Sequence, residues 1–122
     1  MSTDPRAAIA AADTALGIEF GSTRIKAVLI GPDHEVLATG GHGWENHLEG
    51  GLWSYTLDEV VTGLQSAYAS LVADVRERYD VTPVSYGSIG ISAMMHGYLA
   101  FDADGTLLAP FRTWRNTNTG RA

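Results

Sequence analysis

The chain has 122 residues, a mass of 13.0 kDa and 45% hydrophobic residues, which is the size and composition of one globular domain. Cysteine is absent, which excludes disulfides, thiolate metal ligands and thiol nucleophiles, and the formal net charge of -6 argues against a nucleic-acid partner. No apolar run approaches the ~20 residues that cross a bilayer, and Asp4 and Asp13 interrupt the Ala-rich start where a signal peptide would be hydrophobic. We therefore expect a cytoplasmic protein without a membrane partner.

The first third of the chain predicts a flexible leader followed by strands. Residues 1–14 are rich in Ala, Asp, Ser and Thr without a usable period, so we expect no regular element there. Short β-type runs at residues 16–20, 25–30 and 35–39 are separated by the turn-forming sequences GST and GPDH. This spacing predicts an antiparallel meander of three strands. Because the first two runs are apolar on both faces, we expect a sheet that is covered on both sides.

A long helix is predicted in the middle of the chain. Residues 40–55 are rich in Gly and polar groups and include two Trp, which is typical of an ordered loop that packs aromatic side chains. Apolar residues then recur at spacings of three and four over residues 57–79, the pattern of an amphipathic helix. Thr56 and Glu59 have the spacing of a capping box at its start. Gly63 costs the helix about 1 kcal/mol relative to Ala and would allow a close approach to the sheet.

The remaining elements predict the topology. The sequence SIGIS at residues 88–92 reads as a short buried strand that lies parallel to an earlier one through a right-handed crossover. Residues 98–111 read as a β-hairpin with Gly105 at the position of positive φ. Three strands, a crossover helix and a parallel strand form the opening half of the ribonuclease H-like fold of actin-like ATPases, an α/β fold. The last strand then lacks cover at one edge and one face, so we expect a homodimer.

The stretch LGIEFGSTRIKAVLI, residues 16–30, carries the most chemistry. Glu19 ends a strand, and Gly21, Ser22 and Thr23 turn the backbone. The amides and hydroxyls of such a turn can donate to phosphate oxygens, and a neighbouring carboxylate can hold Mg²⁺ through water. From these residues alone, an ordinary hairpin with glycine for turn geometry is the favoured account, because short Gly-Ser turns are common.

The same stretch resembles the first phosphate loop of the FGGY family of carbohydrate kinases, whose usual form is Asp-x-Gly-Thr with Lys or Arg seven residues after the Asp. Glu19, Gly21, Ser22 and Lys26 occupy these positions. IGISAMMHGYLAFDADGTLLAP resembles the segment of xylulose kinase-like members that carries Met-His-Gly before a hairpin, and FRTWRN resembles the Trp-x-Asp stretch that follows. The resemblance spans residues 16–118 in the family's order.

The resemblance implies an enzyme that uses ATP and Mg²⁺ to phosphorylate a ketose or related polyol. It implies that Gly21, Ser22, Thr23 and Lys26 bind the ATP phosphates and that Glu19 positions the metal. The family carries Asp where Glu19 stands, so the reach of this carboxylate differs by one methylene.

The resemblance also implies that Met95, His96, Trp114 and Asn116 line the sugar site. His and Trp offer the hydrogen bonds and the flat apolar surface that a polyol needs. Glycerol kinases carry Arg-Glu where this chain has His96 and Gly97, which favours a ketose over a small triol. Asn116 replaces an Asp of the family, which leaves the identity of the sugar open.

Length is the largest departure from the family, whose members have several hundred residues in two domains with ATP between them. We expect residues 15–122 to be an incomplete N-terminal part of the first domain. The Asp that acts as general base would lie beyond residue 122, so no catalytic residue is expected in the chain, and the chain alone is expected to be inactive.

Two other functions stay open from the sequence. One is a non-catalytic binding or assembly module that pairs through its last strand, and the other is a different actin-like ATPase, such as a chaperone or a filament. The Met-His-Gly sequence and Trp114 argue against the second. A metal site at His42, His47, Glu45 and Glu49 has no familiar ligand spacing.

Overall fold

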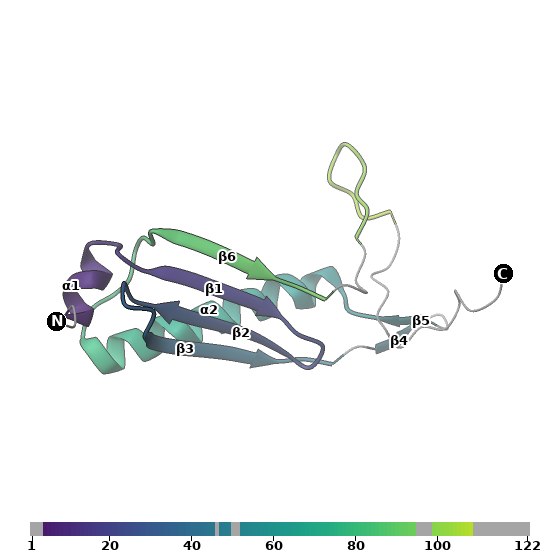
Figure 1. The fold of residues 1–122 in the computed structure, drawn as a ribbon. Helices are drawn as coiled ribbons and strands as arrows, with labels where there is room; N and C mark the ends of the chain where they lie inside the picture. The colour runs from purple at the N-terminus through teal and green to yellow at the C-terminus, as the bar shows by residue number, and fades with distance from the viewer. Residues whose placement is uncertain (1–3, 46, 50–51, 95–98, 109–122) are drawn as a thin grey trace.

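The computed structural model describes residues 4–45, 47–49, 52–94 and 99–108 (Figure 1). In chain order the elements are α1 (Pro5–Ala10), β1 (Ala15–Phe20), β2 (Arg24–Ile30), β3 (Val36–Gly43), β4 (His47–Glu49), β5 (Leu52–Ser54), α2 (Leu57–Tyr79) and β6 (Ser88–Ser92). Apart from α1, β4 and β5, these are the elements that the sequence predicts. No helix in the described ranges combines the length and the hydropathy that a bilayer span requires.

The main sheet has four strands in the order β3-β2-β1-β6. β1 and β2 are antiparallel, as are β2 and β3, whereas β6 runs parallel to β1. The predicted meander, crossover helix and parallel strand are therefore confirmed. β3 extends to Gly43, and β4 and β5 form a second, two-stranded antiparallel sheet, so part of the expected loop over residues 40–55 is strand. The backbone ladder with β2 forms β3 despite its glycines.

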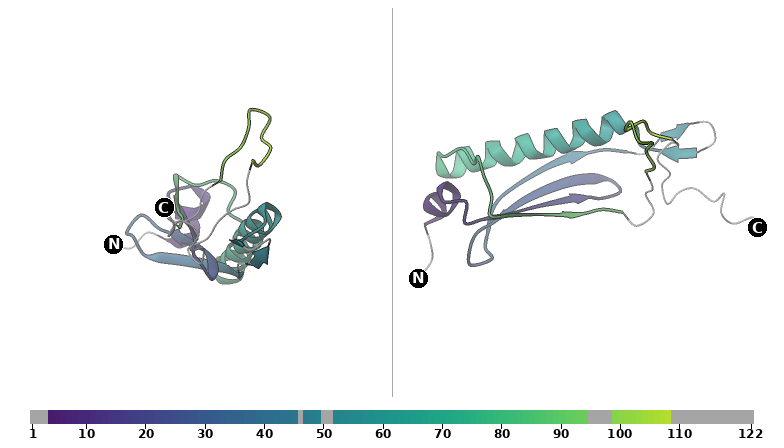
Figure 2. Two further views of the ribbon diagram at one scale, coloured as in Figure 1. Left: turned by 90° about the vertical axis from the view of Figure 1, so that its right-hand side faces the viewer. Right: turned by 90° about the horizontal axis from the view of Figure 1, so that it is seen from above.

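The helix α2 covers one face of the sheet, over β2 and β3 (Figure 2). At its start the Thr56 hydroxyl accepts from Glu59 N at 3.1 Å and the Glu59 carboxylate accepts from Thr56 N at 3.3 Å, which confirms the predicted capping box. Asp80 ends the helix in the left-handed region with φ 53°. The buried residues of the helix recur every four positions: Gly63, Ala67, Leu71 and Val75.

Glycine brings α2 close to the sheet at two places. A Cβ on Gly63 would lie 2.6 Å from Ile25 Cδ1, so the expected close approach is confirmed. A Cβ on Gly40 in β3 would lie 2.4 Å from both Ala67 O and Leu71 N. Strand and helix backbones therefore touch where Gly40 has no side chain.

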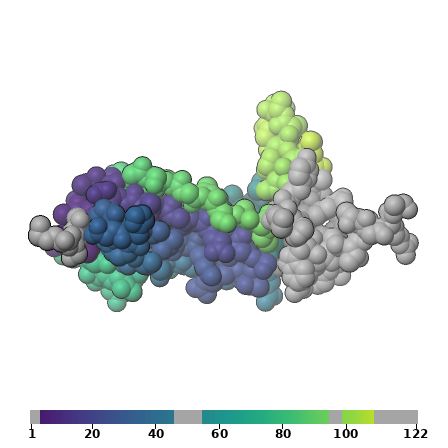
Figure 3. Space-filling model, in the orientation of Figure 1, coloured from purple at the N-terminus to yellow at the C-terminus, as the bar shows by residue number. Residues whose placement is uncertain are grey.

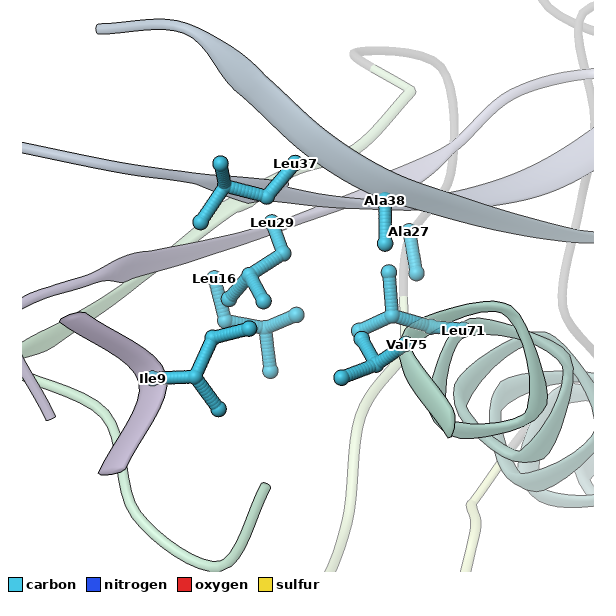
Figure 4. Packing of buried hydrophobic residues seen from close by; sticks show 8 residues of the cluster. All are labelled: Ile9, Leu16, Ala27, Leu29, Leu37, Ala38, Leu71 and Val75. Atoms are coloured by element: carbon cyan, nitrogen blue, oxygen red, sulfur yellow. The ribbon is translucent and has the colours of Figure 1, made fainter. Parts of the chain in front are cut away.

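The largest core cluster lies between the sheet and α2, beside α1 (Figure 4). Its members are Ile9, Leu16, Ala27, Leu29, Leu37, Ala38, Leu71 and Val75. The helix α1 contributes Ile9, and the Asp4 carboxylate caps it by accepting from Arg6 N at 3.1 Å. The structure thus differs from the expected leader over residues 5–10. A helix of six residues is too short to show a period, and burial of its apolar side stabilises it.

Strand β6 is exposed along its whole length. Ile89 and Ile91 share the face of Leu16 and Ile18 in the parallel register, but their exposures are 60% and 68% because α2 lies over β2 and β3 instead. The opposite face of the sheet is also open, as Figures 1 and 3 show. The expectations of a buried strand at residues 88–92 and of a sheet covered on both sides are therefore wrong for the described residues.

A hairpin follows at residues 99–108 and projects from the rest of the fold (Figure 1). Phe101 and Leu107 form an antiparallel bridge, and Gly105 has φ 81°, as the sequence predicts. The Asp102 carboxylate accepts from Asp104 N and Thr106 N, each at 2.9 Å, which stabilises the turn.

Candidate functional site

The turn between β1 and β2 lies at the end of the sheet where α2 begins (Figure 1). Gly21 N donates to Arg24 O at 2.9 Å, and a Cβ on Gly21 would lie 2.9 Å from the same oxygen. Glycine is therefore required here for space. The Gly21 amide is already hydrogen-bonded within the turn, so the donors that the turn can offer to a ligand begin at Ser22.

Two aromatic residues bind the carbonyl side of this turn. Trp44 Nε1 donates to Gly21 O at 2.8 Å, and Trp44 N donates to Thr23 O at 3.1 Å. The Tyr55 hydroxyl donates to Ser22 O. All three carbonyl oxygens of the turn are thus occupied by Trp44 and Tyr55, which we call the aromatic pair.

The aromatic pair is itself held rigidly. The two rings stack with centroids 4.0 Å apart and planes 24° from parallel, and the residues are 7% and 1% exposed. They form a second core cluster with Ile25 of β2 and Ala67 of α2. The composition of residues 40–55 predicts packed aromatic side chains, but no motif in the sequence marks Trp44 or Tyr55 as part of the site.

The amides of Ser22 and Thr23 remain available in the turn. In a trans peptide the N–H points opposite to the C=O of the same unit, and no cis peptide occurs in the described residues. Since the carbonyls of Gly21 and Ser22 point to the aromatic pair, the amides of Ser22 and Thr23 point away from it. Among the described residues, none accepts a hydrogen bond from either amide. Successive free amides with neighbouring hydroxyls form the kind of surface that binds anions.

Glu19 and Lys26 lie beside the turn, on the face of the sheet opposite α2. They are direct cross-strand partners, and both are exposed. A Cβ on Gly21 would lie 3.7 Å from Glu19 Oε1, which places this carboxylate against the turn. The structure therefore brings Glu19, Gly21, Ser22, Thr23 and Lys26 together, as the sequence predicts.

A hollow of about 750 Å³ opens on the same face. Its charged side chains are Glu19, Lys26 and Arg24, and the Arg24 guanidinium lies over Gly41, since a Cβ there would meet Arg24 Nη2 at 2.5 Å. Ser92 of β6, the parallel partner of Glu19, completes the polar end of the hollow. This surface offers two cations and one carboxylate, a combination suited to a phosphate with its metal ion.

The proposed sugar-site residues Met95, His96, Trp114 and Asn116 lie outside the described residues. Their described neighbours Met94 and Leu99 both pack against the second core cluster, which contains the aromatic pair. Met94 and Leu99 therefore both lie beside the core cluster that holds the turn.

Side chains that commonly bind metal ions do not form a cluster in the described part of the chain. No group of three His, Asp or Glu side chains there has a metal-binding arrangement. Of the four residues weighed from the sequence, His42 and Glu45 are described, whereas the side chains of His47 and Glu49 are not.

Shifted pKa values occur away from the turn. The amide of Thr39 and then the guanidinium of Arg78, both bonded at 2.9 Å, lower the pKa of Asp74. Burial, and then a hydrogen bond with Tyr68 at 2.7 Å, raise the pKa of Tyr86. These groups join α2 to the sheet and to the following segment, which is a structural role.

Several solved sugar kinases resemble this chain in structure. A xylulose kinase from Brucella ovis superposes with a TM-score of 0.73 and 21% identity over 87% of this chain and 22% of its own. A xylulose kinase from Bifidobacterium adolescentis superposes with a TM-score of 0.65 and 13% identity, over 89% of this chain and 19% of its own. A glycerol kinase from Plasmodium falciparum, solved with ADP, superposes with a TM-score of 0.69 and 19% identity, over 88% of this chain and 21% of its own.

These matches show that the chain has the fold of part of the FGGY sugar kinases, which confirms the resemblance seen in the sequence at the level of fold. The chain spans about a fifth of the length of the matched kinases. No protein-family model and no curated protein matches the sequence.

Proposed function

We propose that the chain is part of a cytoplasmic FGGY-type carbohydrate kinase that transfers the γ-phosphoryl group of ATP, as its Mg²⁺ complex, to a ketose or related polyol. The observation that carries the proposal is the β1–β2 turn. It offers the free amides of Ser22 and Thr23 beside the Glu19 carboxylate, on a fold shared with sugar kinases.

The residues at the turn fit a nucleotide phosphate. The amides and hydroxyls of Ser22 and Thr23 would donate to the terminal phosphate oxygens, and Lys26 would neutralise part of their charge. Glu19 would hold Mg²⁺ through water, because this ion keeps much of its hydration shell. When bound, ATP with Mg²⁺ supplies the phosphoryl group that is transferred.

The transfer requires groups beyond those described. The sugar hydroxyl oxygen bonds to the γ-phosphorus while the bond from this phosphorus to the β–γ bridging oxygen breaks, and the hydroxyl proton passes to a base. Since the chain spans about a fifth of the matched kinases, we place that base and the adenine site in parts of such a kinase that this chain does not include.

The sugar would bind through Met95, His96, Trp114 and Asn116. His96 supplies a hydrogen-bond donor and acceptor, Asn116 an amide, and Trp114 a flat surface for the C–H face of the sugar. The packing of Met94 and Leu99 against the second core cluster supports a sugar site near the phosphate turn.

The test uses the longest polypeptide that the reading frame containing this sequence encodes. ADP release is measured with Mg²⁺, ATP and a panel of ketoses, polyols and glycerol. Release that depends on a ketose or polyol is expected. ATP hydrolysis without sugar dependence would favour a different actin-like ATPase, and a protein that neither binds nor consumes ATP would end the kinase proposal.

One observation favours a second candidate, a binding or assembly module without catalysis. The edge strand β6 is exposed and uncharged, and could pair with another chain. Stable self-association combined with no ATP affinity would support this alternative.

A further inference from the structure

We propose that Trp44 and Tyr55 are positioning residues that aim the amides of Ser22 and Thr23 at a bound phosphate. This inference rests on the proposed function, because it assumes that the turn receives an anion. It adds two residues, 23 and 33 positions away from their carbonyl partners in the sequence, to the groups that build the site.

The direction of the amides follows from the carbonyls. Trp44 Nε1 holds Gly21 O and the Tyr55 hydroxyl holds Ser22 O, so two successive peptide planes have a fixed orientation. Each plane carries one N–H on its opposite side, that of Ser22 and that of Thr23 respectively. Without these donors, either plane could rotate and turn its carbonyl oxygen toward the phosphate, which would repel it.

The side on which the amides lie follows from the core. The aromatic pair packs with Ile25 and Ala67, and so lies on the face of the sheet that α2 covers. The amides of the same peptide units therefore point toward the other face, where Glu19 and Lys26 border the hollow. Phosphate donors and the carboxylate for the metal thus share one side.

The aromatic pair also connects the turn to two elements of the scaffold. Trp44 directly follows β3, and Tyr55 directly precedes the capping residue Thr56 of α2. Stacked and almost fully buried, the rings have little freedom to move. The turn is therefore held from β3 and from the start of α2, and such support from buried neighbours makes a binding site precise.

Conservative substitutions separate this positioning from packing. Trp44→Phe keeps an aromatic ring but removes the Nε1 donor, and Tyr55→Phe removes only the hydroxyl. Tyr79→Phe is the matched control, because the Tyr79 hydroxyl donates to Leu37 O at 2.8 Å, a similar bond at the other end of α2. All variants are compared in the longest polypeptide that the reading frame containing this sequence encodes, labelled with ¹⁵N.

Two quantities are measured for each variant. Titration with ATP and Mg²⁺, and separately with inorganic phosphate, gives Kd from the shifts of the Ser22 and Thr23 amide resonances. The heteronuclear NOE of the same two amides, without ligand, reports how rigid the turn is. We expect Trp44→Phe and Tyr55→Phe to weaken ATP binding by roughly five- to tenfold, the effect of one lost hydrogen bond, and to lower the NOE at residues 22 and 23. The control should change neither quantity.

The outcomes distinguish the two proposals. If the unaltered chain binds phosphate and both variants bind it equally well with unchanged NOE values, the positioning role is overturned while the proposed function stands. If the unaltered full-length polypeptide binds neither ATP nor phosphate at this turn, the proposed function loses its basis, and the NOE comparison alone decides whether the aromatic pair orders the turn. Should Trp44→Phe fail to fold, Tyr55→Phe decides the question by itself.

Discussion

Gly40 of β3 lies directly against the backbone of Leu71 in α2, so that a Cβ on Gly40 would come within 2.4 Å of Leu71 N. Because backbone atoms cannot move aside as a flexible side chain can, Gly40→Ala should force the helix away from the sheet. We expect a loss of about 1–3 kcal/mol in the free energy of unfolding, measured by urea denaturation. Gly43→Ala in the same strand is the control, since a Cβ there would meet nothing within 4 Å. Equal stability of the two variants would contradict the close contact.

Protonation of Asp74 should lower the free energy of unfolding at acid pH. The Thr39 amide, and then Arg78, lower the pKa of Asp74 in the folded state. The contribution of Asp74 to the free energy of unfolding is therefore present above the unfolded pKa of about 4 and is lost as the pH falls through the lower folded pKa. Asp74→Asn should remove this part of the acid dependence in urea denaturations across the pH range. In Arg78→Ala the pKa of Asp74 should stay below its ordinary value, because the hydrogen bond from the Thr39 amide remains. An NMR titration that shows an ordinary pKa for Asp74 in this variant would contradict this order of causes.

Glu19 should link the metal ion to the nucleotide. In calorimetric titrations of the longest polypeptide that the reading frame encodes, we expect Mg²⁺ to raise the affinity for ATP, and Glu19→Gln to reduce this gain on the order of tenfold, because the amide keeps the size but not the charge. Glu45→Gln, another exposed carboxylate, is the control. An undiminished gain in Glu19→Gln would remove the metal role from this residue.

Strand β6 should mediate self-association. It ends the described sheet with an unpaired edge and carries neither a charge nor a proline, and Ile91 is exposed on its face. We expect light scattering to show a dimer at micromolar concentrations and Ile91→Lys to shift the mass toward one chain. Val84→Lys, at a residue 87% exposed outside the strands, should have no such effect. A mass of one chain for the unaltered protein would exclude this dimer.

Local patterns predicted most of the fold. The turns GST and GPDH and the apolar runs around them define β1, β2 and the start of β3, and the helical period with Thr56 defines α2. By contrast, α1 is too short for a period, and the glycines of β3 conceal its extension, which depends on pairing with β2. The apolar run of β6 indicated burial, but burial depends on what covers a strand.

The candidate site was predictable only in part. Glu19, Gly21, Ser22, Thr23 and Lys26 lie within one hairpin, so their proximity follows from the local sequence. The contribution of Trp44 and Tyr55 arises from contacts between distant parts of the chain, and no short motif records it. The commitment of the Gly21 amide to Arg24 also became evident only from the backbone geometry.

The aromatic pair donates hydrogen bonds to main-chain carbonyl oxygens, which are present whatever the side chain is. Trp44 and Tyr55 donate to main-chain oxygens and not to the hydroxyls of Ser22 and Thr23. Other small residues at positions 22 and 23 would therefore keep these hydrogen bonds. Replacing Ser22 or Thr23 by another small residue should therefore cost the phosphate a hydroxyl donor but leave the direction of the amides unchanged, whereas replacing either ring should change that direction.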